Sequence, residues 1–110
     1  MKFNVKESNG ISVIAIEGRL DTQTAPEAQK KLLDIIKNGA NKVLINFEKL
    51  DYISSAGFRS LLFAAKQMKS QSGKFRVCSL NETITGVFEI SGFITILNVS
   101  NNETEALSEF

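Results

Sequence analysis

The N-terminal residues show the polarity pattern of a β-hairpin. Residues 1–7 alternate between polar and apolar side chains, and residues 11–16 form a run rich in β-branched residues. Both patterns are typical of strands. Asn9-Gly10 lies between them and favours a tight turn, because both residue types tolerate positive φ. We therefore predict a hairpin, followed by a loop that opens at Gly18-Arg19-Leu20-Asp21, where the pattern breaks.

Two further segments show the apolar spacing of amphipathic helices. The apolar positions are Ala28, Leu32, Ile35 and Ile36 in the first segment and Phe58, Leu61, Leu62, Ala65 and Met68 in the second. Thr24-Ala25-Pro26-Glu27 precedes the first helix and matches a capping box, in which Thr24 accepts a hydrogen bond from the amide of Glu27 and Glu27 reaches back. Asn38-Gly39 and Ser72-Gly73 are the predicted helix ends.

The remaining segments predict an α/β fold. Residues 43–45 form a continuous apolar run, typical of a central strand buried on both faces, and residues 74–78 alternate as another strand. Ile84, Val87 and Phe88 indicate a short helix that stops at Ser91-Gly92. A last short strand is expected at Ile96-Leu97, followed by a C-terminal helix that is capped by residues 102–105 and runs through Leu107. The order β-β-α-β-α-β-α-β-α indicates one domain over residues 1–110, a mixed sheet of four or five strands with a parallel centre, and about four helices.

The composition excludes several classes of function. The chain carries 13 basic and 12 acidic side chains, and Lys30, Lys31, Lys66 and Lys69 are spread over separate segments. A nucleic-acid-binding face requires denser basic charge, so we interpret these lysines as solvated surface residues. The chain contains no histidine, which excludes Ser-His-Asp and Cys-His catalysis and histidine metal sites. It also lacks phosphate-loop and dinucleotide-loop glycine motifs, and no cofactor is expected.

Two features indicate a cytoplasmic location. No segment has the roughly 18–20 consecutive apolar residues that cross a bilayer, and the N-terminal residues lack the apolar run of a signal peptide. Cys78 is the only cysteine, so an internal disulfide is impossible and a reducing compartment is favoured. We expect Cys78 to be a small buried residue on a strand.

Two predicted turns are candidate binding sites, because sites in α/β proteins gather where strands lead into helices. One is the turn at residues 18–21. The other is residues 51–57, which places Ser54 and Ser55 at the start of the second helix. Free backbone N–H groups and the positive end of the helix dipole favour an anion there. Plain N-capping by either serine is the alternative explanation.

Four segments resemble the marked sequences of the STAS domain family, particularly the bacterial anti-sigma factor antagonists. Residues 53–62, Ile-Ser-Ser-Ala-Gly-Phe-Arg-Ser-Leu-Leu, resemble the family signature. Residues 17–25 resemble its Gly-x-Leu-Asp loop, residues 44–53 its central strand and exit, and residues 91–93 the turn before its last strand. The segments follow in order along nearly the whole chain, which is more specific than any one motif.

The resemblance implies a protein switch that is not an enzyme. In this family the unphosphorylated antagonist binds an anti-sigma factor with serine kinase activity and frees a sigma factor, and the partner phosphorylates a serine at the helix start. Alignment through Gly57 places the acceptor at Ser55, with Ser54 as the alternative, and matches the family's acidic loop residue to Asp21. The sequence departs from many members by having Ser54 where they have Asp and Ala56 where they have Ser or Thr.

The same resemblance implies a docking surface around Ser55 on a monomer or weak dimer. The chain offers no histidine base to Ser55, so the kinase would supply the catalytic groups and Mg-ATP. Phe63 lies about 140° around the helix from Phe58 and is either a partner anchor or packed beneath a loop. Asp21 has no evident partner in the sequence and is expected to contribute little to stability. The expected partner-binding residues are Asp21, Thr22, Tyr52, Ser54, Ala56, Gly57, Arg59 and Phe63.

Two other functions were weighed against this one. A STAS subunit of a phospholipid-transport ATPase or a signalling assembly would share the fold without a phosphorylation cycle, and a neighbouring transporter operon would favour it. An enzyme could use Asp21, Asp51 and the serines for acid–base chemistry. Loop aspartates beside a helix start are far more often caps or solvated charges.

Overall fold

The computed structural model describes residues 1–92 and 97–110. The predicted hairpin is present: β1 (Lys2–Ser8) pairs antiparallel with β2 (Ile11–Leu20). Asn9 and Gly10 have φ angles of 53° and 80°, as a tight hairpin turn requires.

The second strand is longer than predicted. β2 continues to Leu20, whereas the sequence indicated a loop opening at Gly18. Gly18 has a φ of 92°, and the register of β2 against β4 (Leu50–Ile53) shifts between Gly18 and Arg19. The break in the pattern is therefore an irregularity inside the strand, and the loop begins at Asp21.

The strands form a mixed sheet with a parallel centre, which confirms the predicted fold class. The main path is β1-β2-β3-β5-β6, with β3 (Lys42–Asn46), β5 (Lys74–Cys78) and β6 (Val99–Ser100), and every pairing except β1–β2 is parallel. β4 lies off this path and was not predicted as a strand; among the described residues it pairs with β2.

The last predicted strand is displaced in the structure. Leu97 is helical, and the strand lies three residues further on as β6 (Val99–Ser100). Ile96 and Phe93, which also figured in the sequence predictions, lie outside the described residues.

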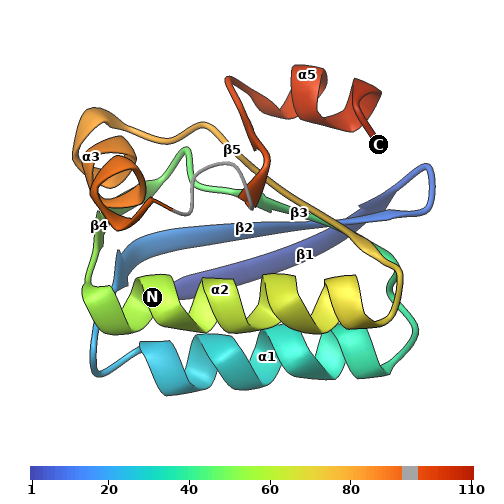
Figure 1. The fold of residues 1–110 in the computed structure, drawn as a ribbon, viewed down its shortest axis with the longest axis horizontal. Helices are drawn as coiled ribbons and strands as arrows, with labels where there is room; N and C mark the ends of the chain where they lie inside the picture. The colour runs from blue at the N-terminus through green and yellow to red at the C-terminus, as the bar shows by residue number, and fades with distance from the viewer. Residues whose placement is uncertain (93–96) are drawn as a thin grey trace.

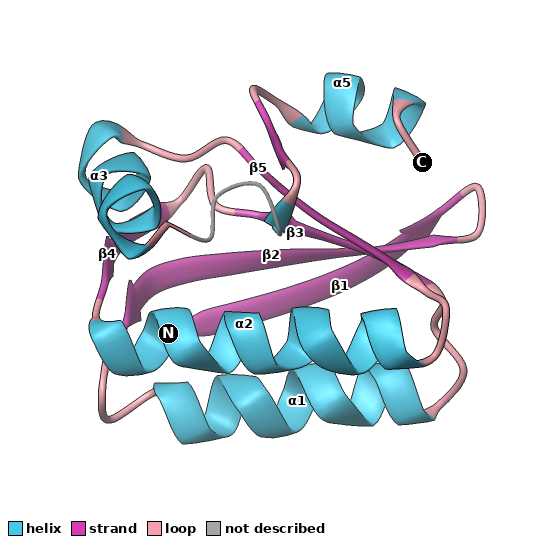
Figure 2. Cartoon of the chain, in the orientation of Figure 1, coloured by secondary structure: helices cyan, strands magenta, loops and turns pink. Residues whose placement is uncertain are grey.

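The helices cover both faces of the sheet. α1 (Ala25–Lys37) and α2 (Ser55–Ser70) lie side by side on one face, and α5 (Glu103–Ser108) lies on the opposite face (Figure 1). α3 (Glu82–Ser91) lies beside β4 at the end of the sheet where α2 begins (Figure 2). No helix in the described part of the chain is both long and apolar enough to cross a membrane.

Successive residues of the central strands enter two different apolar clusters. Ile45 and Val77 belong to the large cluster between the sheet and α1, α2 and α3, whereas Leu44 and Cys78 belong to a smaller cluster under α5. The predicted burial of Cys78 is confirmed, and this burial raises the pKa of its thiol. Both faces of the central sheet are thus committed to packing, so candidate sites lie at its ends and edges.

Candidate functional site

The pairing of β4 with β2 brings the two predicted turns together. Because these strands run parallel, with Leu20 beside Ile53, both chains leave the sheet at the same end. The backbone N–H of Ser54 donates to the carbonyl oxygen of Leu20 at 2.9 Å. A side chain on Gly57 would clash with that same carbonyl group and lie 2.9 Å from Leu20 Cγ. A residue without a side chain is therefore needed where α2 begins, and Gly57 fixes the two turns against each other.

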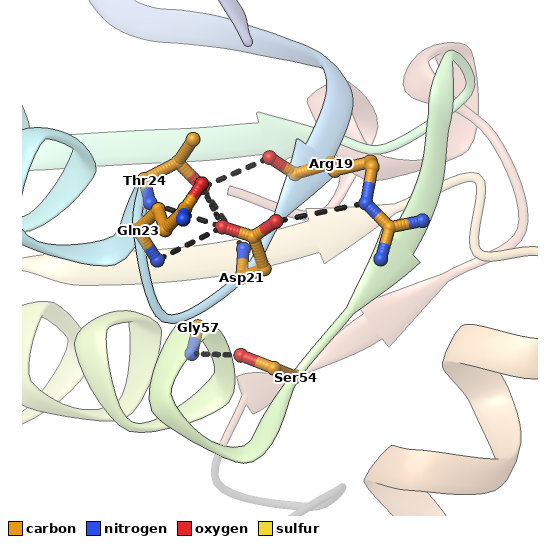
Figure 3. Close-up of polar contacts among 6 residues, drawn as sticks. All are labelled: Arg19, Asp21, Gln23, Thr24, Ser54 and Gly57. Atoms are coloured by element: carbon orange, nitrogen blue, oxygen red, sulfur yellow. Dashed lines mark hydrogen bonds and ion pairs between the residues drawn. The ribbon is translucent and has the colours of Figure 1, made fainter.

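Asp21 organises the first turn. Its Oδ1 accepts hydrogen bonds from the backbone N–H groups of Gln23 and Thr24 at 3.0 and 3.1 Å and from the Thr24 hydroxyl at 3.3 Å (Figure 3). Its Oδ2 lies 3.6 Å from Arg19 Nε. The hydrogen bond from the Thr24 backbone is the main reason why the pKa of Asp21 lies below its ordinary value. The expectation that this carboxylate lacks a partner in the fold is wrong.

The predicted capping box at the start of α1 is absent. Thr24 occupies the N-cap position, but its side chain makes no capping hydrogen bond to the helix. The Thr24 hydroxyl instead accepts from the N–H of Asp21 and donates to the carbonyl oxygen of Arg19, both at 2.9 Å. The Thr24 hydroxyl is therefore bound by backbone groups of the preceding turn and is not used to cap the helix.

Arg19 links the two turns through its side chain. Its guanidinium carbon lies 4.4 Å from the centroid of the Tyr52 ring, an arrangement in which the cation is attracted to the ring face. The same guanidinium faces Asp21, so Asp21, Arg19 and Tyr52 form a continuous row of contacts from β2 to β4. Arg19 was part of the predicted turn at residues 18–21 but was not among the predicted partner-binding residues, because its contact with Tyr52 depends on the unpredicted strand β4.

The two serines at the start of α2 have different roles in the fold. Ser54 is the N-cap, and its Oγ accepts from the N–H of Gly57 at 3.1 Å (Figure 3). Ser55 is the first residue of the helix and is exposed, and its hydroxyl makes no hydrogen bond with the described residues. The capping function therefore belongs to Ser54, and the hydroxyl of Ser55 is available to another molecule.

Of the other predicted partner-binding residues, Thr22, Tyr52, Ala56, Arg59 and Phe63 lie on accessible surfaces around these serines. Gly57 is buried against Leu20, so its prediction as a partner-binding residue is wrong. Thr22, Ala56 and Arg59 line an open groove between α1 and α2. Phe63 lies one turn beyond Arg59 and is 48% exposed, so the prediction that it lies off the core stripe is confirmed. Tyr52 is 36% exposed beside Arg19.

An apolar hollow that was not predicted from the sequence lies beside Ser55. It has a volume of about 340 Å³ and lies between α2 and α3, with Ser55 and Arg59 on its α2 side. Its apolar lining comes from Phe58, Leu62, Val87 and Ile90. Ile90 is 90% exposed. The sequence pattern does indicate an exposed apolar residue at this hollow, because Ile90 lies off the apolar stripe formed by Ile84, Val87 and Phe88. Phe63 lies off the apolar stripe of α2 in the same way.

Comparison with known proteins gives a consistent relationship across the chain. The family model of the STAS domain matches residues 2–106 of the chain. The chain belongs to the STAS domain family. A protein of Bordetella bronchiseptica with the name "Putative anti-sigma factor antagonist BtrV" is 33% identical over 110 residues, which cover 100% of this chain and 95% of that protein.

Two further relatives come from Bacillus. The "Anti-sigma-B factor antagonist" of Bacillus subtilis is 27% identical over 91% of this STAS chain and 91% of its own length. The solved structure of the Bacillus cell fate determinant SpoIIAA in the phosphorylated form superposes with a TM-score of 0.76 at 24% identity, over 98% of both chains. This last likeness establishes the common fold.

The described residues hold no group of three or more His, Cys, Asp or Glu side chains that could bind a metal ion. The site therefore consists of an exposed hydroxyl, two organised turns, and neighbouring apolar and cationic side chains. Such a surface is suited to recognition by another protein.

Proposed function

We propose that this STAS protein is an anti-sigma factor antagonist that binds a kinase-type anti-sigma factor and is switched off by phosphorylation of Ser55. Family membership and the names of two relatives, at 33% and 27% identity over nearly the whole chain, support the antagonist function. In this proposal the protein is the substrate of a kinase, acts in the cytoplasm and needs no cofactor of its own.

The exposed hydroxyl of Ser55 is the observation that carries the proposal. A kinase must reach the acceptor oxygen, and Ser55 presents it at the first turn of α2, unbonded among the described residues. Ser54 is a poorer acceptor, because its oxygen already accepts a hydrogen bond from Gly57 and its removal would weaken the helix start. The SpoIIAA structure in phosphorylated form supports the idea that this fold tolerates phosphate.

The chemistry requires groups from the partner. The Ser55 oxygen attacks the γ-phosphorus of ATP, a new O–P bond forms, and the bond between the γ-phosphorus and the bridging oxygen breaks to release ADP. The hydroxyl proton passes to a base on the kinase, because the chain has no histidine and no described side chain bonds this hydroxyl.

The surface around Ser55 supports a partner that covers both sides of α2. On one side lies the apolar hollow with the exposed Ile90, and on the other the groove lined by Thr22 and Ala56. Arg59 borders both hollows, and Phe63 continues the same exposed face of the helix. We expect apolar side chains of the anti-sigma factor to contact Ile90 and Phe63, with Ser55 directed into its active site.

Phosphate transfer tests the proposal directly. The protein is incubated with a kinase-type anti-sigma factor of the same organism and Mg-ATP, and the phosphorylated peptide is identified by mass spectrometry. We expect one phosphate, on Ser55, and a complex with the kinase that forms only before transfer. If the kinase neither binds nor modifies the chain, the antagonist function is wrong, and a STAS subunit of a transport or signalling assembly becomes the better explanation.

A further inference from the structure

A basic hollow lies far from the Ser55 site, where the end of α2 meets the start of β5. It has a volume of about 530 Å³, and its lining includes Ala65 and Phe75, which are both almost fully buried in the core. Lys66, Lys69, Lys74 and Arg76 line it, against a single carboxylate, Glu109. The sequence analysis treated Lys66 and Lys69 as scattered solvated charges, but the fold places them beside two cations from β5.

The charge of this hollow is not neutralised within the described part of the molecule. Both carboxylate oxygens of Glu109 already have partners, since Oε2 lies 3.1 Å from Arg76 Nη1 and Oε1 accepts a hydrogen bond from the Ser100 hydroxyl at 3.3 Å. The three lysines are exposed and form no ion pair with any described carboxylate. The hollow therefore concentrates positive charge on a chain whose 13 cations and 12 anions nearly cancel.

The hollow is separate from the proposed phosphorylation site. Lys69 follows Ser55 by fourteen residues on α2, a separation of roughly 21 Å at 1.5 Å per residue. At that distance exposed charges are largely screened from each other at physiological salt. Binding in the hollow can therefore occur whether or not Ser55 carries phosphate.

We propose that this hollow binds an acidic segment of a protein partner. Three flexible ammonium groups from two elements match several carboxylates spaced along a chain. Nucleic acid fits less well, because the net charge of the chain is only +1.

The test measures binding of a fluorescent peptide rich in glutamate, by anisotropy at about 50 mM salt, where screening is modest. One variant carries Lys66→Glu, Lys69→Glu and Lys74→Glu, and a milder one carries Gln at the same positions. The matched control carries Lys2→Glu, Lys37→Glu and Lys49→Glu, which are exposed, lie outside the hollow and change the net charge equally. Circular dichroism verifies that all variants fold.

We expect the glutamate variant to bind the peptide at least about tenfold more weakly, which corresponds to about 1.4 kcal/mol. The glutamine variant should show an intermediate loss of affinity, and the control should lose much less affinity than either. Binding should also weaken as salt rises. Equal losses in the control and the glutamate variant, or no binding by the parent protein, overturn the proposal. So does tighter binding of a single-stranded oligonucleotide of equal charge, which would identify a nucleic-acid surface. Phosphorylation of Ser55 should proceed normally in the glutamate variant, so this test and that of the proposed function can fail independently.

Discussion

Replacing each serine at the start of α2 by alanine should separate helix capping from phosphate acceptance. Ser54→Ala removes the oxygen that accepts from the Gly57 N–H at 3.1 Å. Loss of such a cap costs about 1 kcal/mol, which for a domain of this size lowers Tm by roughly 4 °C. Ser55→Ala removes an exposed hydroxyl that bonds no described residue, and surface changes of this kind stay within about 0.5 kcal/mol.

The assay combines thermal unfolding with phosphate incorporation by the kinase. We expect Ser54→Ala to unfold at lower temperature yet still accept phosphate, and Ser55→Ala to keep its Tm and accept none. Ser70→Ala is the matched control on the same helix, because Ser70 is exposed and lies near the far end of α2. It should be phosphorylated like the parent protein.

The opposite pattern would refute the reasoning. If Ser55→Ala accepts phosphate while a folded Ser54→Ala does not, then Ser54 is the acceptor, and its capping role does not protect it from the kinase. If both single variants accept phosphate and the double variant does not, the kinase does not distinguish the two positions.

Three further predictions concern the same region. Ser55→Asp should keep the Tm, because a negative charge in the first turn gains about 0.3–1 kcal/mol from the helix dipole, yet bind the anti-sigma factor at least about tenfold more weakly by calorimetry; unchanged affinity would contradict the switch. Asp21→Ala should lower the Tm more than Asp51→Ala, an exposed control. The pKa of Asp21 is lowered in the folded state, so the stabilising effect of its carboxylate is present at neutral pH. The difference in Tm between the parent protein and Asp21→Ala should vanish as pH falls through that lowered pKa, and a difference that persists in acid would show another cause. Gly57→Ala should cost about 1–3 kcal/mol in urea unfolding, because the new methyl group meets the Leu20 carbonyl, and a neutral result would mean that β2 and α2 can move apart.

The elements that the sequence predicted are those encoded by adjacent residues. Asn9-Gly10 specifies its own turn, the run at residues 43–45 is apolar without interruption, and the stripe of α2 repeats over about three turns. In each case the deciding information lies within a few residues, so tertiary contacts only reinforce it.

The elements that the sequence did not predict depend on distant contacts. β4 has buried residues only at its ends, Leu50 and Ile53, so it lacks the alternation of a strand and is fixed by its pairing with β2. The capping box failed because Asp21, three residues upstream, takes the Thr24 hydroxyl. The basic hollow was missed for the same reason, since Lys66 and Lys74 meet only after α2 packs on the sheet.

The different roles of Ser54 and Ser55 at the start of α2 explain how a phosphate could change partner binding without changing the fold. Ser54 holds the helix end, and Asp21 holds the neighbouring turn through groups that a modified Ser55 would not touch. A phosphate on Ser55 adds about −1.5 to −2 charges at neutral pH, next to the free N–H groups of the first helical turn and one turn before the exposed Arg59. In the isolated protein these groups make the charge favourable. In a complex the same charge would have to be desolvated beside the apolar surface of Val87 and Ile90, which costs several kcal/mol when unpaired. Phosphorylation of Ser55 thus destabilises the complex with the partner and leaves the folded chain intact.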